Sequence, residues 1–279
     1  MRLACAISTP EVHPSPPVAL LSGDFAERLA KASVMGYDGV ELMVARPDEL
    51  DAAALREQVA RAGLEIAAIA SGAVYMMDGL TLLAADADVA ARAAARMDGL
   101  IAFAAAVGAP IVTIGGFRGR LASAGGGEQA RERLVQALRV AAIHAAERNV
   151  RLALEPLNRY ESDIINTAAE CLALCQEIDR THLGLLLDTY HVNIEEASVS
   201  GAFRLGLEAG RLWHVHLGDN NRLAPGQGHM DFATIVTALH EGGYSGYLSA
   251  ELLPLPDPDA AAAATIRHMR RFIPKENGA

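Results

Sequence analysis

Cysteine is scarce in this chain of 279 residues, which contains only three. Cys5, Cys171 and Cys175 are too few and too unevenly spaced for a disulfide framework or a cysteine-rich zinc site, so a reducing compartment is favoured. Basic residues are also few, since 24 Lys and Arg stand against 34 Asp and Glu, for a formal net charge of -10. This balance argues against nucleic acid or an anionic membrane as the partner.

Long apolar runs are missing as well. Hydrophobic residues make up 51% of the chain, which excludes intrinsic disorder. Asp, Glu and Arg interrupt these residues, so no stretch predicts a transmembrane helix. Residues 1–8 predict a first strand rather than a signal peptide, and residues 275–279 predict a frayed tail. We therefore expect a cytoplasmic protein whose residues 1–279 form one domain.

Short β-type segments alternate with Ala- and Leu-rich segments of helical spacing. Such alternation, with eight β-then-α units in about 250 residues, predicts an α/β fold of the (β/α)8 TIM barrel type. A doubly wound sheet is the alternative, but it more often has a glycine-rich turn after the first strand, where this chain has STPE. The expected strands are residues 2–8, 39–44, 66–71, 111–115, 151–155, 183–188, 212–217 and 247–251. The expected helices are residues 25–35, 55–62, 89–107, 129–148, 168–178, 232–241 and 260–272.

The last four expected strands end near ionisable residues, namely Glu155, Asp188, His216 and Glu251. In a barrel of this kind, active sites lie at the carboxyl ends of the strands. Three carboxylates brought together there repel one another unless a cation lies between them. A mixed oxygen and nitrogen donor set suits Mn²⁺, Mg²⁺ or Co²⁺, and Zn²⁺ is also compatible. Each acid alone could be a strand-end cap or a surface charge, but four in register predict one divalent metal ion.

Two glutamates beside a metal ion predict proton transfer alpha to a carbonyl. The metal would polarise the carbonyl oxygen and hold the enediolate, while Glu155 and Glu251 would remove and return the proton. Return to the opposite face gives epimerisation, and return to the neighbouring carbon gives aldose–ketose isomerisation. Both outcomes fit these residues.

His214 shares a strand face with His216, because side chains alternate along a strand. His216 lies nearer the barrel mouth and is the better ligand, so we expect His214 to lie behind it or inside the barrel. The same alternation turns Trp213 the other way, toward the helices. Glu41, on the second expected strand, is either a further site residue or a buried acid with a partner.

Polar residues follow the strand ends and suit a polyhydroxylated substrate. Among them we expect Glu161, His191 and Arg222 to contact it. Arg118 and Arg120 follow the fourth strand and could clamp the carboxylate of a sugar acid, since Arg suits that task. The alternative for these two arginines is a surface salt bridge.

Four stretches carry a family resemblance: residues 154–161 (LEPLNRYE), 187–196 (LDTYHVNIEE), 214–216 (HVH) and 221–228, which begins with NR and ends with PGQG. They resemble the xylose-isomerase-like barrel superfamily of sugar isomerases and epimerases, and above all its ketose 3-epimerases, which act on D-tagatose and D-psicose. Residues 228–232 (GHMDF) and 253–256 (LPLP) are most similar to the 5-keto-L-gluconate epimerase type, which interconverts that acid with D-tagaturonate.

The resemblance implies a role for each matching residue. It implies that Glu155 and Glu251 are both metal ligands and the two proton-transfer residues, and that Asp188 and His216 complete the metal site. It also implies that the carbonyl end of the substrate is held by Glu161, His191 and Arg222. Family members are often homodimers or homotetramers. The chain departs from the 3-epimerases at Tyr190, where they usually have Phe.

Other functions remain open at this point. A nuclease of the endonuclease IV type would need a richer, three-zinc ligand set and a basic surface. An inosose dehydratase, or an isomerase of hydroxypyruvate or inososes, would use the same metal chemistry. A non-catalytic sugar-binding barrel would bind sugar without exchanging the alpha proton. We expect a manganese-dependent epimerase of a keto-uronate (5-keto-L-gluconate or D-tagaturonate) or of a ketohexose.

Overall fold

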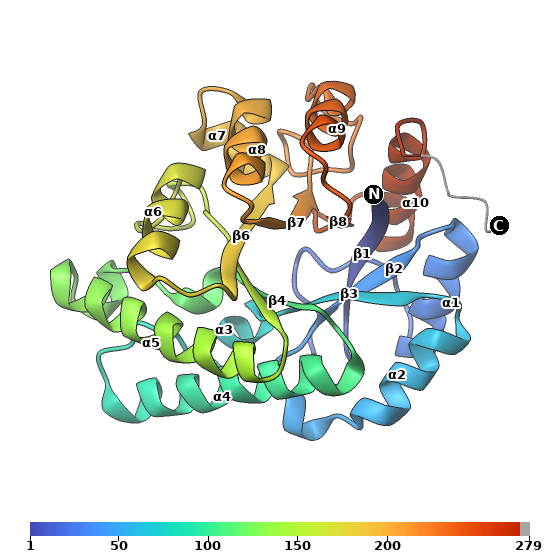
Figure 1. Cartoon of the computed structure of the whole chain (residues 1–279). Helices are drawn as coiled ribbons and strands as arrows, with labels where there is room; N and C mark the ends of the chain where they lie inside the picture. Colours follow the sequence, from blue (N-terminus) through green and yellow to red (C-terminus); the bar gives the residue numbers. More distant parts are fainter. Residues whose placement is uncertain (274–279) are drawn as a thin grey trace.

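The strands close into a parallel barrel in sequential order, with β8 paired to β1 (Figure 1). The computed structural model describes residues 1–273. The order excludes the doubly wound sheet, which stays open, and confirms the TIM barrel. The strands are β1 (Arg2–Ser8), β2 (Gly39–Met43), β3 (Glu65–Ala70), β4 (Ile111–Ile114), β5 (Arg151–Leu154), β6 (Leu183–Asp188), β7 (Leu212–Leu217) and β8 (Tyr247–Ala250).

Helices surround the barrel (Figure 1). They are α1 (Phe25–Met35), α2 (Ala52–Arg61), α3 (Gly72–Asp78), α4 (Ala87–Val107), α5 (Gly127–Glu147), α6 (Ala168–Ile178), α7 (Thr189–Glu195), α8 (Val199–Glu208), α9 (Phe232–Glu241) and α10 (Pro258–Met269). Short 3-10 turns span Pro47–Glu49, Gly116–Arg118 and Ala122–Ala124. The predicted tail, residues 275–279, lies outside the described residues, and the single-domain assignment stays a prediction.

The ends of α1 show why the sequence marks its helices well. Asp24 accepts a hydrogen bond from the backbone N–H of Glu27, and the Glu27 side chain accepts one from the N–H of Asp24. This reciprocal capping satisfies donors that the first helical turn leaves free. At the other end Gly36 has φ of 91°, a left-handed conformation that glycine adopts without steric cost.

Three helices, α3, α7 and α8, are absent from the sequence-based prediction. In α8 the reason is visible, because Gly201 and Gly206 lower the intrinsic helix propensity. A Cβ atom at Gly206 would lie 3.2 Å from the Cβ of Leu212, so glycine lets the helix approach β7 closely. Packing on the barrel therefore stabilises a helix that its own sequence favours weakly.

A β-bulge in β7 overturns the prediction for Trp213. The pairing of β6 with β7 steps from Leu185–Leu212 to Leu186–His214, which leaves Trp213 as an extra residue. Trp213 therefore packs on a buried cluster that includes Leu186 and Ala153, and Ala153 lies on the same strand face as Glu155. Trp213 and His214 both point into the barrel, and Trp213 does not pack against the helices.

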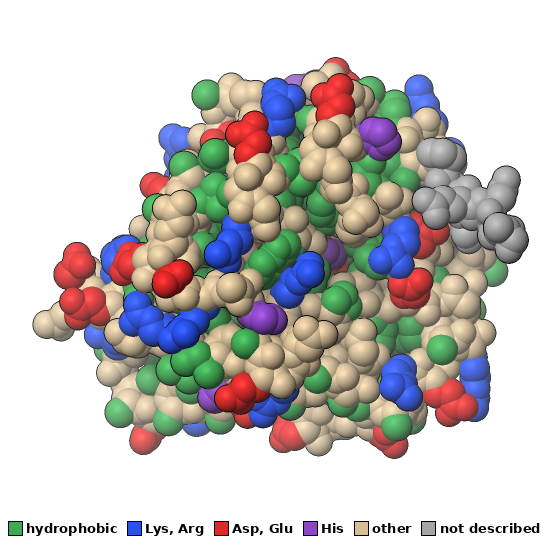
Figure 2. All heavy atoms as spheres, viewed as in Figure 1, with side chains coloured by type: hydrophobic (Ala, Val, Ile, Leu, Met, Phe, Trp, Pro, Cys, Tyr) green, Lys and Arg blue, Asp and Glu red, His purple; other side chains and the backbone are tan. Residues whose placement is uncertain are grey.

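The three cysteines are buried and free. Within residues 1–273, no helix combines the length and apolar character needed to cross a bilayer. On the face drawn in Figure 2, acidic and basic side chains are interspersed, and hydrophobic side chains lie between them.

Candidate active site at the barrel mouth

The four predicted metal ligands lie together at the carboxyl ends of neighbouring strands. Glu155 and Glu251 directly follow β5 and β8, Asp188 is the last residue of β6, and His216 is the penultimate residue of β7. One ligand atom of each lies within 4.8 Å of those of the other three. Glu155, Asp188 and His216 are buried, and the Glu251 side chain is 14% exposed. The barrel therefore brings together residues that are nearly 100 positions apart in sequence.

Three of these residues aim an unpaired polar atom into the cluster. Glu155 Oε1, Asp188 Oδ2 and His216 Nδ1 are buried and have no hydrogen-bond partner among the described residues. His216 Nδ1 lies 3.5 Å from Glu155 Oε1 and 3.3 Å from Glu251 Oε2. Buried polar atoms without partners are unfavourable and call for an ion or water. Carboxylate oxygens with one imidazole nitrogen are a donor set for Mn²⁺, Mg²⁺, Co²⁺ or Zn²⁺, so the residues fit a divalent cation.

The electrostatics of the cluster agree with that fit. Burial, together with the nearby charge of Glu155, raises the pKa of Asp188 to about 7. Burial also raises the pKa of Glu155, although His216 opposes the shift. Without a bound cation, ionisation of either carboxyl group is therefore unfavourable. A cation between them would stabilise their ionised forms.

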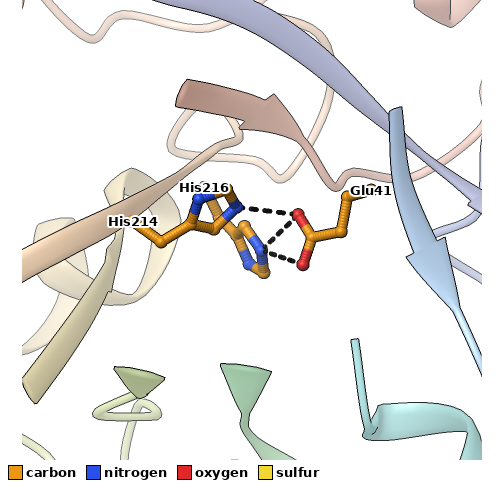
Figure 3. A group of neighbouring side chains, drawn as sticks. All are labelled: Glu41, His214 and His216. Atoms are coloured by element: carbon orange, nitrogen blue, oxygen red, sulfur yellow. Dashed lines mark hydrogen bonds and ion pairs between the residues drawn. The ribbon is translucent and has the colours of Figure 1, made fainter. Parts of the chain in front are cut away.

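Glu41 reaches across the barrel interior from β2 to both histidines of β7 (Figure 3). Its carboxylate lies 2.9 Å from His214 Nε2 and 3.1 Å from His216 Nε2, and all three side chains are buried. Although burial raises the pKa of Glu41, the two histidines hold that pKa well below its ordinary value. An ionised carboxylate only accepts hydrogen bonds, so His216 carries a proton on Nε2 and directs Nδ1 toward the ligand cluster. Although burial opposes the shift, the surrounding carboxylates, Glu41 first among them, raise the pKa of His216 well above its ordinary value, and a cation bound at Nδ1 would take the place of the second proton.

The contact of Glu41 with both histidines bears on two questions that the sequence leaves open, and the three residues also form a second group that could hold a metal ion. Glu41 is a buried acid that holds a residue of the site, and His214 lies behind His216 as its neighbour on the same carboxylate. The sequence shows Glu41 on a strand but gives no sign that it spans the barrel.

The three predicted substrate contacts lie beside the ligand cluster. Arg222 Nη1 donates to Glu161 Oε1 at 2.9 Å, and its guanidinium lies 4.9 Å from the centre of the Tyr190 ring. His191 Nε2 lies 3.9 Å from Glu155 Oε1 and 3.9 Å from Asp188 Oδ2. Burial, together with the positive charge of Arg222, holds the pKa of His191 well below its ordinary value, so the ring is neutral.

Arg118 does not lie free at the mouth. Its side chain is fully buried and donates hydrogen bonds to the backbone carbonyls of Glu155 and Ile165. The guanidinium thus supports the backbone that carries Glu155, and the expectation that Arg118 clamps a substrate carboxylate is wrong for this arrangement. Arg120 is exposed and donates to the carbonyl of Tyr160 at 3.2 Å, so its role as a clamp stays a prediction.

Gly115 is a residue of the site that the sequence analysis does not single out, since it appears there only as the last residue of an expected strand. It directly follows β4, and a Cβ atom there would lie 2.5 Å from Glu155 Oε2. Real Cβ contacts are longer, so any side chain at this position would displace the carboxylate. The only sequence signal is a glycine directly after a strand, which is typical of a close backbone approach.

Comparison with known proteins agrees with this fold and site. Residues 29–272 match the family described as xylose isomerase-like TIM barrel, and the chain belongs to this family. An L-ribulose 3-epimerase from Mesorhizobium japonicum is 35% identical over 230 residues, which are 80% of this chain and 73% of that protein. A D-psicose 3-epimerase from Enterocloster bolteae is 39% identical over 145 residues, which are 52% of this chain and 46% of that protein.

A solved structure of an L-ribulose 3-epimerase superposes with a TM-score of 0.77 at 27% identity, covering 100% of this chain and 99% of that one. Together with the acid and histidine cluster at the barrel mouth, these similarities class the protein as an enzyme, an isomerase.

Proposed function

We propose that the protein is a divalent-metal-dependent epimerase that moves a proton at the carbon next to the keto group of a sugar. The observation that carries this proposal is the convergence of Glu155 and Glu251 on the unpaired Nδ1 of His216. The names of the relatives, which are 3-epimerases, favour epimerisation over aldose–ketose isomerisation or dehydration.

Four residues would hold the cation: Glu155, Asp188, His216 and Glu251. When bound, it would supply positive charge that polarises the substrate carbonyl and makes the neighbouring C–H more acidic. Glu41 would keep Nδ1 of His216 available to it, and Arg118 would keep the backbone of Glu155 in place.

The two glutamates would exchange the proton. Glu155 and Glu251 extend from β5 and β8 and approach His216 Nδ1 from different strands. One carboxylate takes the proton from the carbon, and the other, in its acid form, returns a proton to the opposite face. In the reverse reaction the two residues exchange these roles, which inverts the same carbon in either direction.

The remaining polar groups would orient the sugar. Arg222 and the Nε2–H of His191 would donate hydrogen bonds to substrate oxygens, and Glu161 would accept one from a hydroxyl. Fixed donors and acceptors of this kind place the reacting carbon between the two glutamates.

The substrate that we propose is a ketopentose or ketohexose. Arg118 donates to backbone carbonyls and Arg222 is paired with Glu161. Neither arginine is therefore free to bind the carboxylate of a sugar acid. Exposed Arg120 supports a keto-uronate, such as 5-keto-L-gluconate, as the second substrate class. We also propose that the cation is Mn²⁺, that the protein is cytoplasmic, and that it forms a homodimer or homotetramer.

The test is turnover in D₂O with added Mn²⁺ or Mg²⁺, followed by NMR of the sugars. A ketose, a keto-uronate, an inosose and hydroxypyruvate serve as substrates. We expect an epimer with deuterium at the carbon next to the carbonyl, because the second glutamate carries a solvent-derived proton. An epimer without deuterium would contradict the two-residue proton transfer. Binding of sugars without any exchange would support a sugar-binding barrel instead.

A further inference from the structure

Asn158 is a buried amide between two of the predicted substrate contacts. It lies four residues beyond the end of β5 and is 0% exposed. Its Oδ1 accepts hydrogen bonds from the backbone N–H groups of Tyr160 at 3.0 Å and of Glu161 at 3.2 Å. Only the oxygen of an amide can accept two N–H groups, so these contacts determine which way the amide points.

With Oδ1 so placed, Nδ2 of Asn158 points toward the site. It lies 2.7 Å from His191 Nδ1 and 3.1 Å from Glu161 Oε1. The backbone N–H of Asn158 also points at His191 Nδ1, at 3.3 Å. Two N–H donors converge on that ring nitrogen, which must therefore hold a lone pair. The proton of the neutral imidazole is left on Nε2.

The protonated nitrogen faces the metal-ligand cluster. His191 Nε2 is buried, has no hydrogen-bond partner among the described residues, and lies 3.9 Å from both Glu155 Oε1 and Asp188 Oδ2. The two imidazoles at the mouth thus present opposite atoms to the same space. His216, held by Glu41, would offer the lone pair of Nδ1 to a bound cation, whereas His191, held by Asn158, offers an N–H.

We propose that Asn158 is a positioning residue that fixes His191 as an N–H donor to an oxygen of the bound keto sugar. The same amide group holds Glu161 beside it, so one side chain sets both a donor and an acceptor for the substrate. This inference rests on the proposed function for the identity of the ligand, but the tautomer of His191 is a property of the protein itself.

The test uses the substitution Asn158→Asp in the Mg²⁺-loaded protein with ¹⁵N-labelled histidine. Asp retains an oxygen for Tyr160 and Glu161 but places a second oxygen, an acceptor, against His191 Nδ1. We expect the NMR signals of His191, assigned with His191→Gln, to show protonated Nε2 and bare Nδ1 in the natural protein. In the variant we expect a proton on Nδ1, with kcat reduced about 10- to 100-fold.

Asn166→Asp is the matched control, because it removes the same NH₂ group in the same loop. Asn166 Nδ2 donates to the backbone carbonyls of Leu157 and Ser162. We expect this control to change stability but to leave the His191 tautomer as it is. The Kd for Mg²⁺ should be unchanged in both variants, which separates positioning of His191 from damage to the metal ligands.

Two results would overturn the inference. One is a proton on His191 Nδ1 in the natural protein, and the other is an Asn158→Asp variant with the natural tautomer and an unchanged kcat. Absence of epimerase activity on every sugar tested would instead contradict the proposed function, and the NMR result would still decide the tautomer.

Discussion

The two halves of the barrel differ in what their strands carry at the mouth. Strands β5 to β8 end at the candidate metal-ligand cluster. Strands β2 and β4 bring to it the carboxylate of Glu41, which contacts His216 Nε2, and Gly115, which leaves space for Glu155. We call β5 to β8 the charged half, which would bind the cation and carry out the reaction. We call β1 to β4 the supporting half, which holds the side chains of the charged half in position. The contrast shows that residues without a reacting atom can still determine whether such a site works.

Removing either proposed proton-transfer group should have the largest effect. We expect Glu155→Gln and Glu251→Gln each to lower kcat by about 100- to 10,000-fold, because an amide cannot transfer the proton. Turnover of a ketose and the melting temperature are the measurements.

Glu65→Gln is the control for these two variants, since Glu65 begins β3 at the opposite end of the barrel and pairs with Arg2. We expect that variant to keep natural activity. Near-natural turnover in both Glu155→Gln and Glu251→Gln would show that the charged half does not perform the chemistry.

Glu41 tests whether the supporting half matters for the metal. We expect Glu41→Gln to weaken binding of Mn²⁺ by about 10- to 100-fold, since residues that orient a histidine ligand have effects of this size. Isothermal titration calorimetry gives both the Kd and the stoichiometry, which we expect to be one ion per chain. Two ions per chain would mean that Glu41 and His214 bind a metal themselves.

A substitution at Gly115 tests the steric contribution of the supporting half, where the Glu41 variant tests its electrostatic contribution. We expect Gly115→Ala to weaken Mn²⁺ binding about tenfold, because its Cβ would displace Glu155 Oε2. Gly116→Ala is the matched control, since a Cβ there would meet nothing nearer than the Tyr75 ring at 4.0 Å. Equal affinities in the two variants would argue against a steric role for Gly115.

The smallest effect should come from Arg120, at the exposed edge of the site. We expect Arg120→Ala to reduce kcat/KM for a keto-uronate by up to about fivefold, in keeping with an exposed ion pair. The neutral ketose provides the internal control and should be affected less. A uniform loss for both substrates would remove Arg120 from recognition of the carboxylate.

The sequence predicts the charged half well and the supporting half poorly, for a physical reason. Each metal-ligand candidate lies at the end of a strand, and parallel strands bring such ends together whatever the details of packing. Gly115, Glu41 and Asn158 act through contacts between segments that are distant in sequence or folded back on themselves. No periodicity in the chain reports those contacts.

Local geometry explains the errors in the prediction. Strict alternation predicts that the Trp213 side chain points toward the helices, but the β-bulge turns it into the barrel. This bulge arises from the pairing of β7 with β6. Arg118 has the charge of a carboxylate clamp, but the fold turns it toward backbone carbonyls of Glu155 and Ile165. Neither strand alternation at Trp213 nor the charge of Arg118 indicates these contacts, because both contacts depend on neighbouring segments.

The most direct test of the account is a crystal structure of the protein grown with Mn²⁺ and analysed by anomalous diffraction. We predict one anomalous peak per chain, within bonding distance of Glu155, Asp188, His216 Nδ1 and Glu251. A peak located between Glu41 and His214, or no peak at the mouth at saturating Mn²⁺, would contradict it.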